Sequence, residues 1–374
     1  DSPAFRRLAV GLVAGDLCAR QKGEEHTYEW SLLMFSNRFV RPHALPPPFR
    51  PLITRMTSTF TGESGRKYTR GKVLQNHRTN PSLSVFMADS EDDSFVVKRV
   101  TRQLYDLSKR LASEFGSSSR LRVHVDRNEE EAVLVFPYYE TTLLGLIQGD
   151  PEFPTEGRME ILRQVGEAIR ELHSKDWMHL DVKPDNVLVN CKINQEGCKT
   201  VTDAALGDFD LVCKCEQAMP LNTPYAIGNV MWRSPEGQTG RGVTKASDIY
   251  SFGLVCIYAL GGGDLLLLNN YQELAGRKIT PEQEILTRHF SYFGPVPDAV
   301  FKDVGDENWS AALKGAAEIA DELVKDDPRL RFERWGEELG PEALRVIAGM
   351  VALNPKARLD INQVMTHPFW AEDA

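Results

Sequence analysis

The segment that decides the fold is His179-Leu180-Asp181-Val182-Lys183-Pro184-Asp185-Asn186. With average composition, a His-x-Asp-x-Lys-x-x-Asn match arises by chance in roughly one chain in a thousand of this length. Apolar residues at 162, 165, 169 and 172 precede it at helical spacing, and a short apolar run at 187–189 follows. The segment is therefore predicted to form a polar loop between a buried helix and a strand.

Four further motifs follow this loop in a fixed order. They are Gly207-Asp208-Phe209-Asp210, Gly228-Asn229-Val230-Met231-Trp232-Arg233-Ser234-Pro235-Glu236, Ser247-Asp248-Ile249-Tyr250-Ser251-Phe252-Gly253 and Asn354-Pro355-Lys356-Ala357-Arg358-Leu359. In sequence and spacing the five motifs together resemble the eukaryotic protein kinase family, of the Ser/Thr-directed type, over about residues 66–370. The resemblance identifies no subfamily.

The resemblance implies a role for each polar residue, and the chemistry of phosphate transfer explains each role. Asp181 is expected to orient the incoming hydroxyl and accept its proton. Lys183 is expected to stabilise charge on the transferred group. Asn186 and Asp208 supply the oxygen ligands that a Mg²⁺ ion prefers. The implied cofactors are ATP and Mg²⁺, and the implied substrate is a protein Ser/Thr hydroxyl.

Other residues of the motifs are expected to hold the structure together. Glu236 and Arg358 are predicted to form an ion pair within the helical part of the chain. Asp248 is predicted to cap the backbone of the loop at 179–186, which the resemblance implies to be the catalytic loop.

The nucleotide site extends into the preceding part of the chain. Lys98 ends the apolar strand 95–98, as the family's phosphate-binding lysine does. Glu114 lies beside the apolar stripe of the helix predicted over 102–115, so we expect it to pair with Lys98. Phe136 is expected to close the back of an adenine pocket, with the backbone of Tyr138 and Tyr139 binding the base.

Three departures from the family bear on activity. The stretch 74–84, which should cover the phosphates, contains no glycine, and Asn76, Ser82 and Ser84 are expected to bind phosphates by their side chains. Asp210 replaces the glycine after Phe209, which predicts a stiffer segment or extra negative charge near the metal. Leu180 replaces an arginine that pairs with a phosphorylated residue, so control by such a phosphate should matter less.

The element pattern predicts an α+β, bilobal fold. Short strands at 72–74, 83–88, 95–100, 121–125 and 132–136, with the one helix, form a small antiparallel lobe at 66–139. A larger, mainly helical lobe occupies 140–371, with loops at 190–235 and 264–308 and a long insert-like region at 264–340. Residues 1–65 are expected to be an N-terminal extension with a Pro-rich, basic linker. The five prolines at 42–51 favour an extended linker there.

Composition narrows the partners and the compartment. With 44 basic and 53 acidic side chains, the formal charge is −9, which argues against binding nucleic acid. Residues 37–78 nevertheless hold nine Arg or Lys and one acid, so we expect this stretch to be either a solvated basic surface or a docking face for an acidic partner or a membrane. Six cysteines predict a reducing, intracellular and cytoplasmic location. No apolar run is long enough for a transmembrane segment.

Three functions remain open from the sequence. The first is an active Ser/Thr protein kinase. The second is a pseudokinase, a nucleotide-binding or scaffolding module with little phosphate transfer, which the glycine-free stretch and Asp210 favour. The third is a small-molecule kinase of the aminoglycoside type, against which Pro235-Glu236 and Asp248 argue because such enzymes lack the corresponding motifs.

Overall fold

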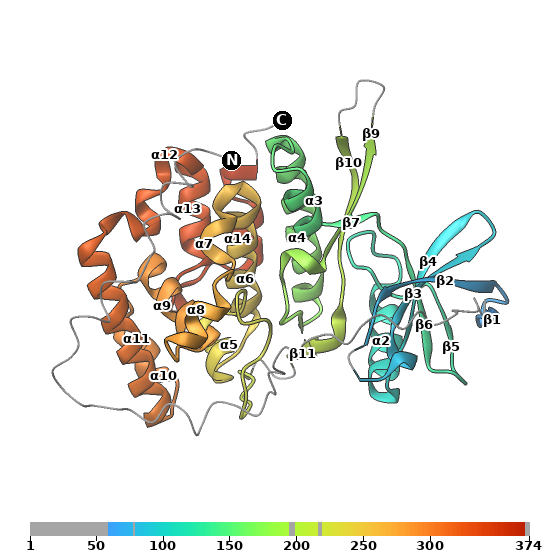
Figure 1. Ribbon diagram of the computed structural model, residues 1–374, viewed down its shortest axis with the longest axis horizontal. Coiled ribbons are helices and arrows are strands. Elements are labelled where there is room, and N and C mark those ends of the chain that lie inside the picture. The colour runs from blue at the N-terminus through green and yellow to red at the C-terminus, as the bar shows by residue number, and fades with distance from the viewer. Residues whose placement is uncertain (1–58, 78, 194–198, 216–218, 371–374) are drawn as a thin grey trace.

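The computed structural model describes residues 59–77, 79–193, 199–215 and 219–370. Within them the chain forms a small sheet lobe and a larger helical lobe, side by side (Figure 1). This confirms the α+β, bilobal prediction. The predicted Pro-rich segment at 42–51 and most of the basic stretch 37–78 lie outside the described residues. None of the described helices is long and apolar enough to cross a membrane.

The small lobe is built on one antiparallel sheet of six strands in the order β1-β2-β3-β4-β6-β5. Tyr68, Phe95, Val97, Val133 and Val135 bury one another within the lobe. The strands are β1 (Thr59–Thr61), β2 (Lys67–Gln75), β3 (Val85–Ser90), β4 (Asp93–Arg99), β5 (Asp126–Asn128) and β6 (Val133–Pro137). Because β1 pairs with β2, the lobe includes residues before 66, and the predicted boundary there is wrong.

The strand predicted at 121–125 is also wrong. Leu121 instead forms a parallel bridge with Leu206 of the large lobe, and the sheet strand begins at Asp126. Asp126 is buried there, and its carboxylate accepts hydrogen bonds from the Tyr68 and Ser64 hydroxyls. These bonds satisfy a carboxylate that the sequence pattern alone places in a turn.

The predicted helix at 102–115 is confirmed as α2 (Arg102–Phe115). Its N-cap is Thr101, whose hydroxyl accepts from the amide of Leu104. Leu111 and Phe115 at its end are buried in the main core, which continues into the large lobe. The helix therefore connects the two lobes on one side of the space between them.

The large lobe is organised around α4 (Thr155–Ser174) and α6 (Lys245–Ile257), both with many buried residues. The region 264–308, predicted to be loop, is largely helical, so that prediction is wrong. Residues of α9 and α11 belong to the main core, so the region 264–340 packs as part of the large lobe. The remaining helices are α3 (Leu143–Gly149), α5 (Pro235–Thr239), α7 (Gly263–Leu266), α8 (Tyr271–Gly276), α9 (Pro281–Phe293), α10 (Asp298–Asp303), α11 (Glu307–Asp326), α12 (Gly336–Leu339), α13 (Pro341–Met350) and α14 (Ile361–Met365).

A long antiparallel hairpin projects beside the small lobe (Figure 1). It consists of β9 (Val187–Ile193) and β10 (Lys199–Leu206), and β7 (Thr141–Thr142) pairs with β9. A second, two-stranded ladder joins β8 (Trp177–Met178) to β11 (Cys213–Lys214). The catalytic loop runs from β8 to β9, and residue 207 follows β10, so these strands bring both motifs to one place.

The predicted ion pair between Glu236 and Arg358 is confirmed, with both groups buried. Burial raises the pKa of Glu236, but the charge and hydrogen bonds of Arg358 outweigh this and hold that pKa below its ordinary value. The pair therefore contributes stability at neutral pH that is lost as pH falls through the lowered pKa.

Replacing Glu236 with glutamine is expected to destabilise the fold by about 3–5 kcal/mol, because it leaves the buried Arg358 charge uncompensated. Denaturant unfolding at pH 7 measures the loss, and the loss should shrink at acid pH. Asp303→Asn, which breaks an exposed pair with Lys356, is the control and should cost less than about 1 kcal/mol. Equal unfolding free energies for the two variants would contradict this role.

Candidate active site

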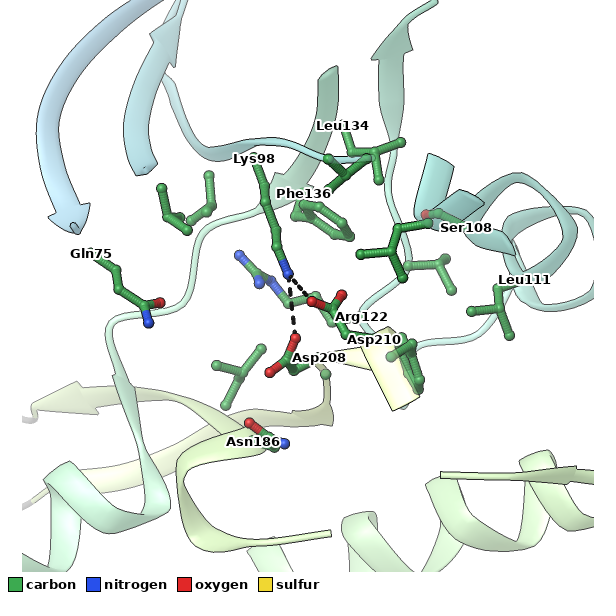
Figure 2. Close-up of a pocket in the computed structure, with 18 of the residues that line it drawn as sticks. Gln75, Lys98, Ser108, Leu111, Arg122, Leu134, Phe136, Asn186, Asp208 and Asp210 are labelled. Atoms are coloured by element: carbon green, nitrogen blue, oxygen red, sulfur yellow. Dashed lines mark hydrogen bonds and ion pairs between the residues drawn. The ribbon is translucent and has the colours of Figure 1, made fainter. Parts of the chain in front are cut away.

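A cavity of about 410 Å³ lies between the two lobes (Figure 2). Its walls come from β3, β4, β6 and α2 of the small lobe and from the catalytic loop and residues 207–210 of the large lobe. Lys98, Asn186 and Asp208 all line it, although they lie far apart in the sequence. The fold therefore brings together three of the residues that the sequence singled out.

The catalytic loop is fixed from beneath by Asp248 of α6. Its two carboxylate oxygens accept hydrogen bonds from the amides of His179 and Leu180, each at 2.8 Å, which confirms the predicted cap. Leu180 adopts a φ of 64°, a strained conformation that these bonds hold in place. The His179 ring lies 3.0 Å from the Gly207 carbonyl, so Nε2 is assigned as the donor, and the loop is joined to the next motif.

The carboxylate of Asp181 is held by three donors. Its Oδ1 accepts from the amide of Asn229 at 3.0 Å. Its Oδ2 accepts from Lys183 Nζ at 2.5 Å and from Asn186 Nδ2 at 3.1 Å. An ionised carboxylate fixed in this way can orient a hydroxyl and accept its proton, with the lysine charge alongside.

Asp208 and Asn186 place two oxygen atoms that could bind a metal ion at the floor of the cavity. Asn186 donates its amide hydrogens to Asp181, which leaves the amide oxygen as a free acceptor on the side of Asp208 (Figure 2). Asp208 adopts a φ of 62°, and the ring of the next residue, Phe209, packs against His179. These oxygens fit a hard cation such as Mg²⁺ that keeps phosphate and water ligands, although no cluster of three acidic, His or Cys ligands occurs among the described residues.

Lys98 reaches into the cavity from the end of β4, as expected, but its acidic partner differs from the prediction. Nζ lies 2.7 Å from Asp210 Oδ2 and 3.5 Å from Asp208 Oδ1 (Figure 2). Glu114 instead accepts hydrogen bonds from Trp177 Nε1 at 2.8 Å and Lys214 Nζ at 3.0 Å. The predicted pair is wrong because Glu114 lies in the last turn of α2, where it faces β8 and β11 of the large lobe.

The glycine-free stretch between β2 and β3 is held by its own side chains. The hydroxyl of Ser84 is buried and accepts from the amide of His77 at 3.0 Å, and Ser84 does not line the described cavity, so phosphate binding by Ser84 stays a prediction. Asn80 caps a 3-10 helix at Pro81–Leu83 through the amide and hydroxyl of Ser82. These side-chain hydrogen bonds fix the backbone of a stretch that, without glycine, also lacks the conformational freedom of a glycine-rich loop.

The expected base-binding segment contains a residue that the sequence did not reveal. Arg122 lines the cavity, donates from Nε to the carbonyl of Pro137 at 2.8 Å and stacks on Phe136, which closes the cavity as expected. Burial lowers the pKa of Arg122 to about 10. The Pro137 carbonyl is therefore engaged within the chain, and proline supplies no amide donor beside it.

The two tyrosines after Pro137 do not line the described cavity. The hydroxyl of Tyr139 instead donates to Asp203 of β10 at 2.9 Å, and burial raises its pKa. A contribution of Tyr138 and Tyr139 to base binding would therefore come from their backbone, as the sequence analysis expected.

Comparisons with known proteins agree with this geometry. The protein kinase domain model matches residues 121–370. Similar curated proteins include the sensor for unfolded proteins in the ER ire1 of Schizosaccharomyces pombe (28% identical over 48% of this chain and 20% of that protein). They also include the serine/threonine-protein kinase PknA of Corynebacterium glutamicum (24%, over 48% and 40%) and the mitogen-activated protein kinase SLT2/MPK1 of Saccharomyces cerevisiae (23%, over 54% and 37%).

A solved structure extends the likeness to the fold. A chain from the crystal structure of the yeast RNA Pol II CTD kinase CTDK-1 complex superposes with a TM-score of 0.58 at 16% identity. The match covers 81% of this chain and 97% of that one. By contrast, this chain spans only 20–40% of the length of the three curated relatives.

Proposed function

The chain belongs to the protein kinase family, and from this premise we propose that it is a protein serine/threonine kinase that transfers the γ-phosphate of Mg·ATP to a protein hydroxyl. The observation that carries the proposal is that Lys98, Asn186 and Asp208 line one interlobe cavity, while hydrogen bonds join Asp181 to Asn186 and to Lys183 beside it. Each residue supplies a group that phosphate transfer requires. In this reaction the protein mainly positions the reactants and stabilises charge, and it need not form covalent bonds to them.

In the proposed mechanism, Asp181 orients the substrate hydroxyl and accepts its proton as the oxygen attacks. Lys183, beside it, stabilises negative charge on the group in transit. Asp208 and Asn186 would hold Mg²⁺, which when bound neutralises phosphate charge. Lys98 binds the phosphates that stay with the nucleotide.

A second candidate function is a nucleotide-binding or scaffolding module with little transfer. The hydrogen bond from Arg122 to the Pro137 carbonyl favours it, because one of the two lone pairs of that oxygen is then already engaged within the chain. The structured, glycine-free stretch over the cavity favours it as well. Both features concern nucleotide affinity rather than the transfer step.

Titration with ATP is expected to raise the melting temperature of the chain in the presence of Mg²⁺, and much less in its absence. Nucleotide at 100 times its Kd should stabilise the fold by about 2.7 kcal/mol. Lys98→Met should remove most of this shift, and Asp303→Asn should leave it unchanged. If neither Mg²⁺ nor millimolar ATP changes the melting temperature of the unaltered chain, the scaffolding function is favoured and the kinase proposal fails.

The remaining expectations rest on the sequence. An acidic docking partner for the basic stretch 37–78, an intracellular and cytoplasmic location, and the identity of the protein substrate stay predictions. The motifs that contain Glu236 and Asp248 support a protein rather than a small-molecule substrate, because small-molecule kinases of the aminoglycoside type lack them. In the structure both residues make the contacts that the resemblance to protein kinases implies.

A further inference from the structure

We propose that Asp210, rather than an acid of α2, is the positioning residue that holds Lys98 against the nucleotide phosphates. The inference deepens the proposed function and rests on it. It assigns a specific partner to the residue that replaces glycine after Phe209, for which the sequence predicted only a stiffer segment or extra negative charge near the metal.

The first support is the contact itself. Lys98 Nζ lies 2.7 Å from Asp210 and 3.5 Å from Asp208, and Figure 2 shows Asp210 directed at the lysine. The Lys98 side chain is 26% exposed and that of Asp210 is 45% exposed, so the pair lies at the cavity wall, partly shielded from water. A charge-assisted bond of this length fixes the direction of a flexible lysine.

The second support is the chemistry of α2, which offers Lys98 no acid. The α2 residues that line the cavity are Leu104, Leu107, Ser108 and Leu111. The two carboxylates of the helix are paired elsewhere: Asp106 with Arg102 at 3.3 Å, and Glu114 with Lys214 at 3.0 Å. The lysine must therefore find its partner on another element.

The third support is the division of labour between the two acids that contact Lys98. If the carboxylate of Asp208 binds the metal ion, its negative charge is shared with that ion and no longer serves Lys98 alone. Asp210, two residues on in a 3-10 helix, remains available for the lysine. The segment 208–210 then positions both the metal ligand and Lys98, and no acid from α2 is needed to orient the lysine.

The experiment moves the acid from one element to the other. Asp210→Asn keeps the shape of the side chain and removes its charge, so Mg·ATP affinity, measured by calorimetry, should fall about tenfold. Adding Leu107→Glu, which puts a carboxylate on the cavity face of α2, should restore the affinity of the double variant to within about threefold of the original. Ser108→Glu repeats the rescue at the neighbouring position in case the Leu107 variant does not fold.

A second readout separates positioning from metal binding. The Mg²⁺ concentration that gives half-maximal ATP binding should be unchanged in Asp210→Asn if the residue acts through Lys98. A higher Mg²⁺ requirement that the α2 acids do not correct would make Asp210 a metal ligand and overturn the inference. Asp303→Asn, which breaks a lysine–aspartate pair outside the cavity, controls for general charge loss and should bind like the original.

Failure of the inference and failure of the proposed function look different. If the unaltered chain binds Mg·ATP and Asp210→Asn binds it equally well, only the role of Asp210 is overturned. The same holds if both relocated acids leave the affinity as low as in Asp210→Asn. If the unaltered chain binds no Mg·ATP at all, the proposed function and the inference fall together.

Discussion

Replacing Asp208 with asparagine is expected to reduce phosphate transfer by about a thousandfold or more and to remove Mg²⁺-dependent nucleotide binding. The change converts a charged oxygen ligand into a neutral amide at the cavity floor, where Asp208 also lies 3.5 Å from Lys98. A neutral amide is a weaker ligand for a hard cation, and it no longer offsets the lysine charge.

The same substitution should leave the fold in place. Asp208 adopts a φ of 62°, which asparagine tolerates about as well as aspartate. Its side chain is 47% exposed, so little packing is lost, and the unfolding free energy should change by less than about 1 kcal/mol. Incorporation of labelled phosphate into casein or into the chain itself measures transfer. Transfer at the original rate in a correctly folded variant would refute the proposed mechanism.

The catalytic loop and its supports were predictable because their residues act through contacts that motifs preserve. Asp248 caps the loop and Glu236 pairs with Arg358, as expected. Both are buried acids, and a buried ionised carboxylate needs a counter-charge or hydrogen-bond donors, so the family's motifs indicate their partners.

The partner of Lys98 was not predictable from the sequence in this way. A helical wheel places Glu114 beside the apolar stripe of α2, but it does not say which element faces that side near the helix end. In the structure that element is the β8–β11 ladder, where Trp177 and Lys214 hold the carboxylate. Burial raises the pKa of Glu114, but the hydrogen bonds from Trp177 and Lys214 and the lysine charge outweigh it and lower that pKa, so the carboxylate has its partners here.

Arg122 and Asp126 show a second limit of sequence patterns. Both are charged residues in a segment that the pattern assigns to a strand and the turn after it, and both are largely enclosed in the folded chain. Each is accommodated by partners from distant positions: the Pro137 carbonyl for Arg122, and Ser64 and Tyr68 for Asp126. Periodicity carries no information about such partners, so these contacts came only from the three-dimensional arrangement.

The second large effect is expected at Asp181, where asparagine should lower the rate of transfer by about a hundred- to ten-thousandfold while Mg·ATP affinity changes less than about threefold. The carboxylate accepts from Lys183, Asn186 and the amide of Asn229, but it does not line the described interlobe cavity. We therefore expect its chemical role to fall in the transfer step, when a hydroxyl gives up its proton, and not in nucleotide binding.

The contrast with Asp208 makes this prediction specific. Asparagine at 181 keeps one oxygen to accept from Lys183 or from the Asn229 amide, so the loop should hold its shape and the melting temperature should stay close to the original. Single-turnover transfer with saturating Mg·ATP isolates the chemical step, and calorimetry on the same sample gives the affinity. Because Asp208→Asn should lose both quantities and Asp181→Asn only the rate, equal losses of affinity in the two variants would place Asp181 in the nucleotide site and remove it as the proton acceptor.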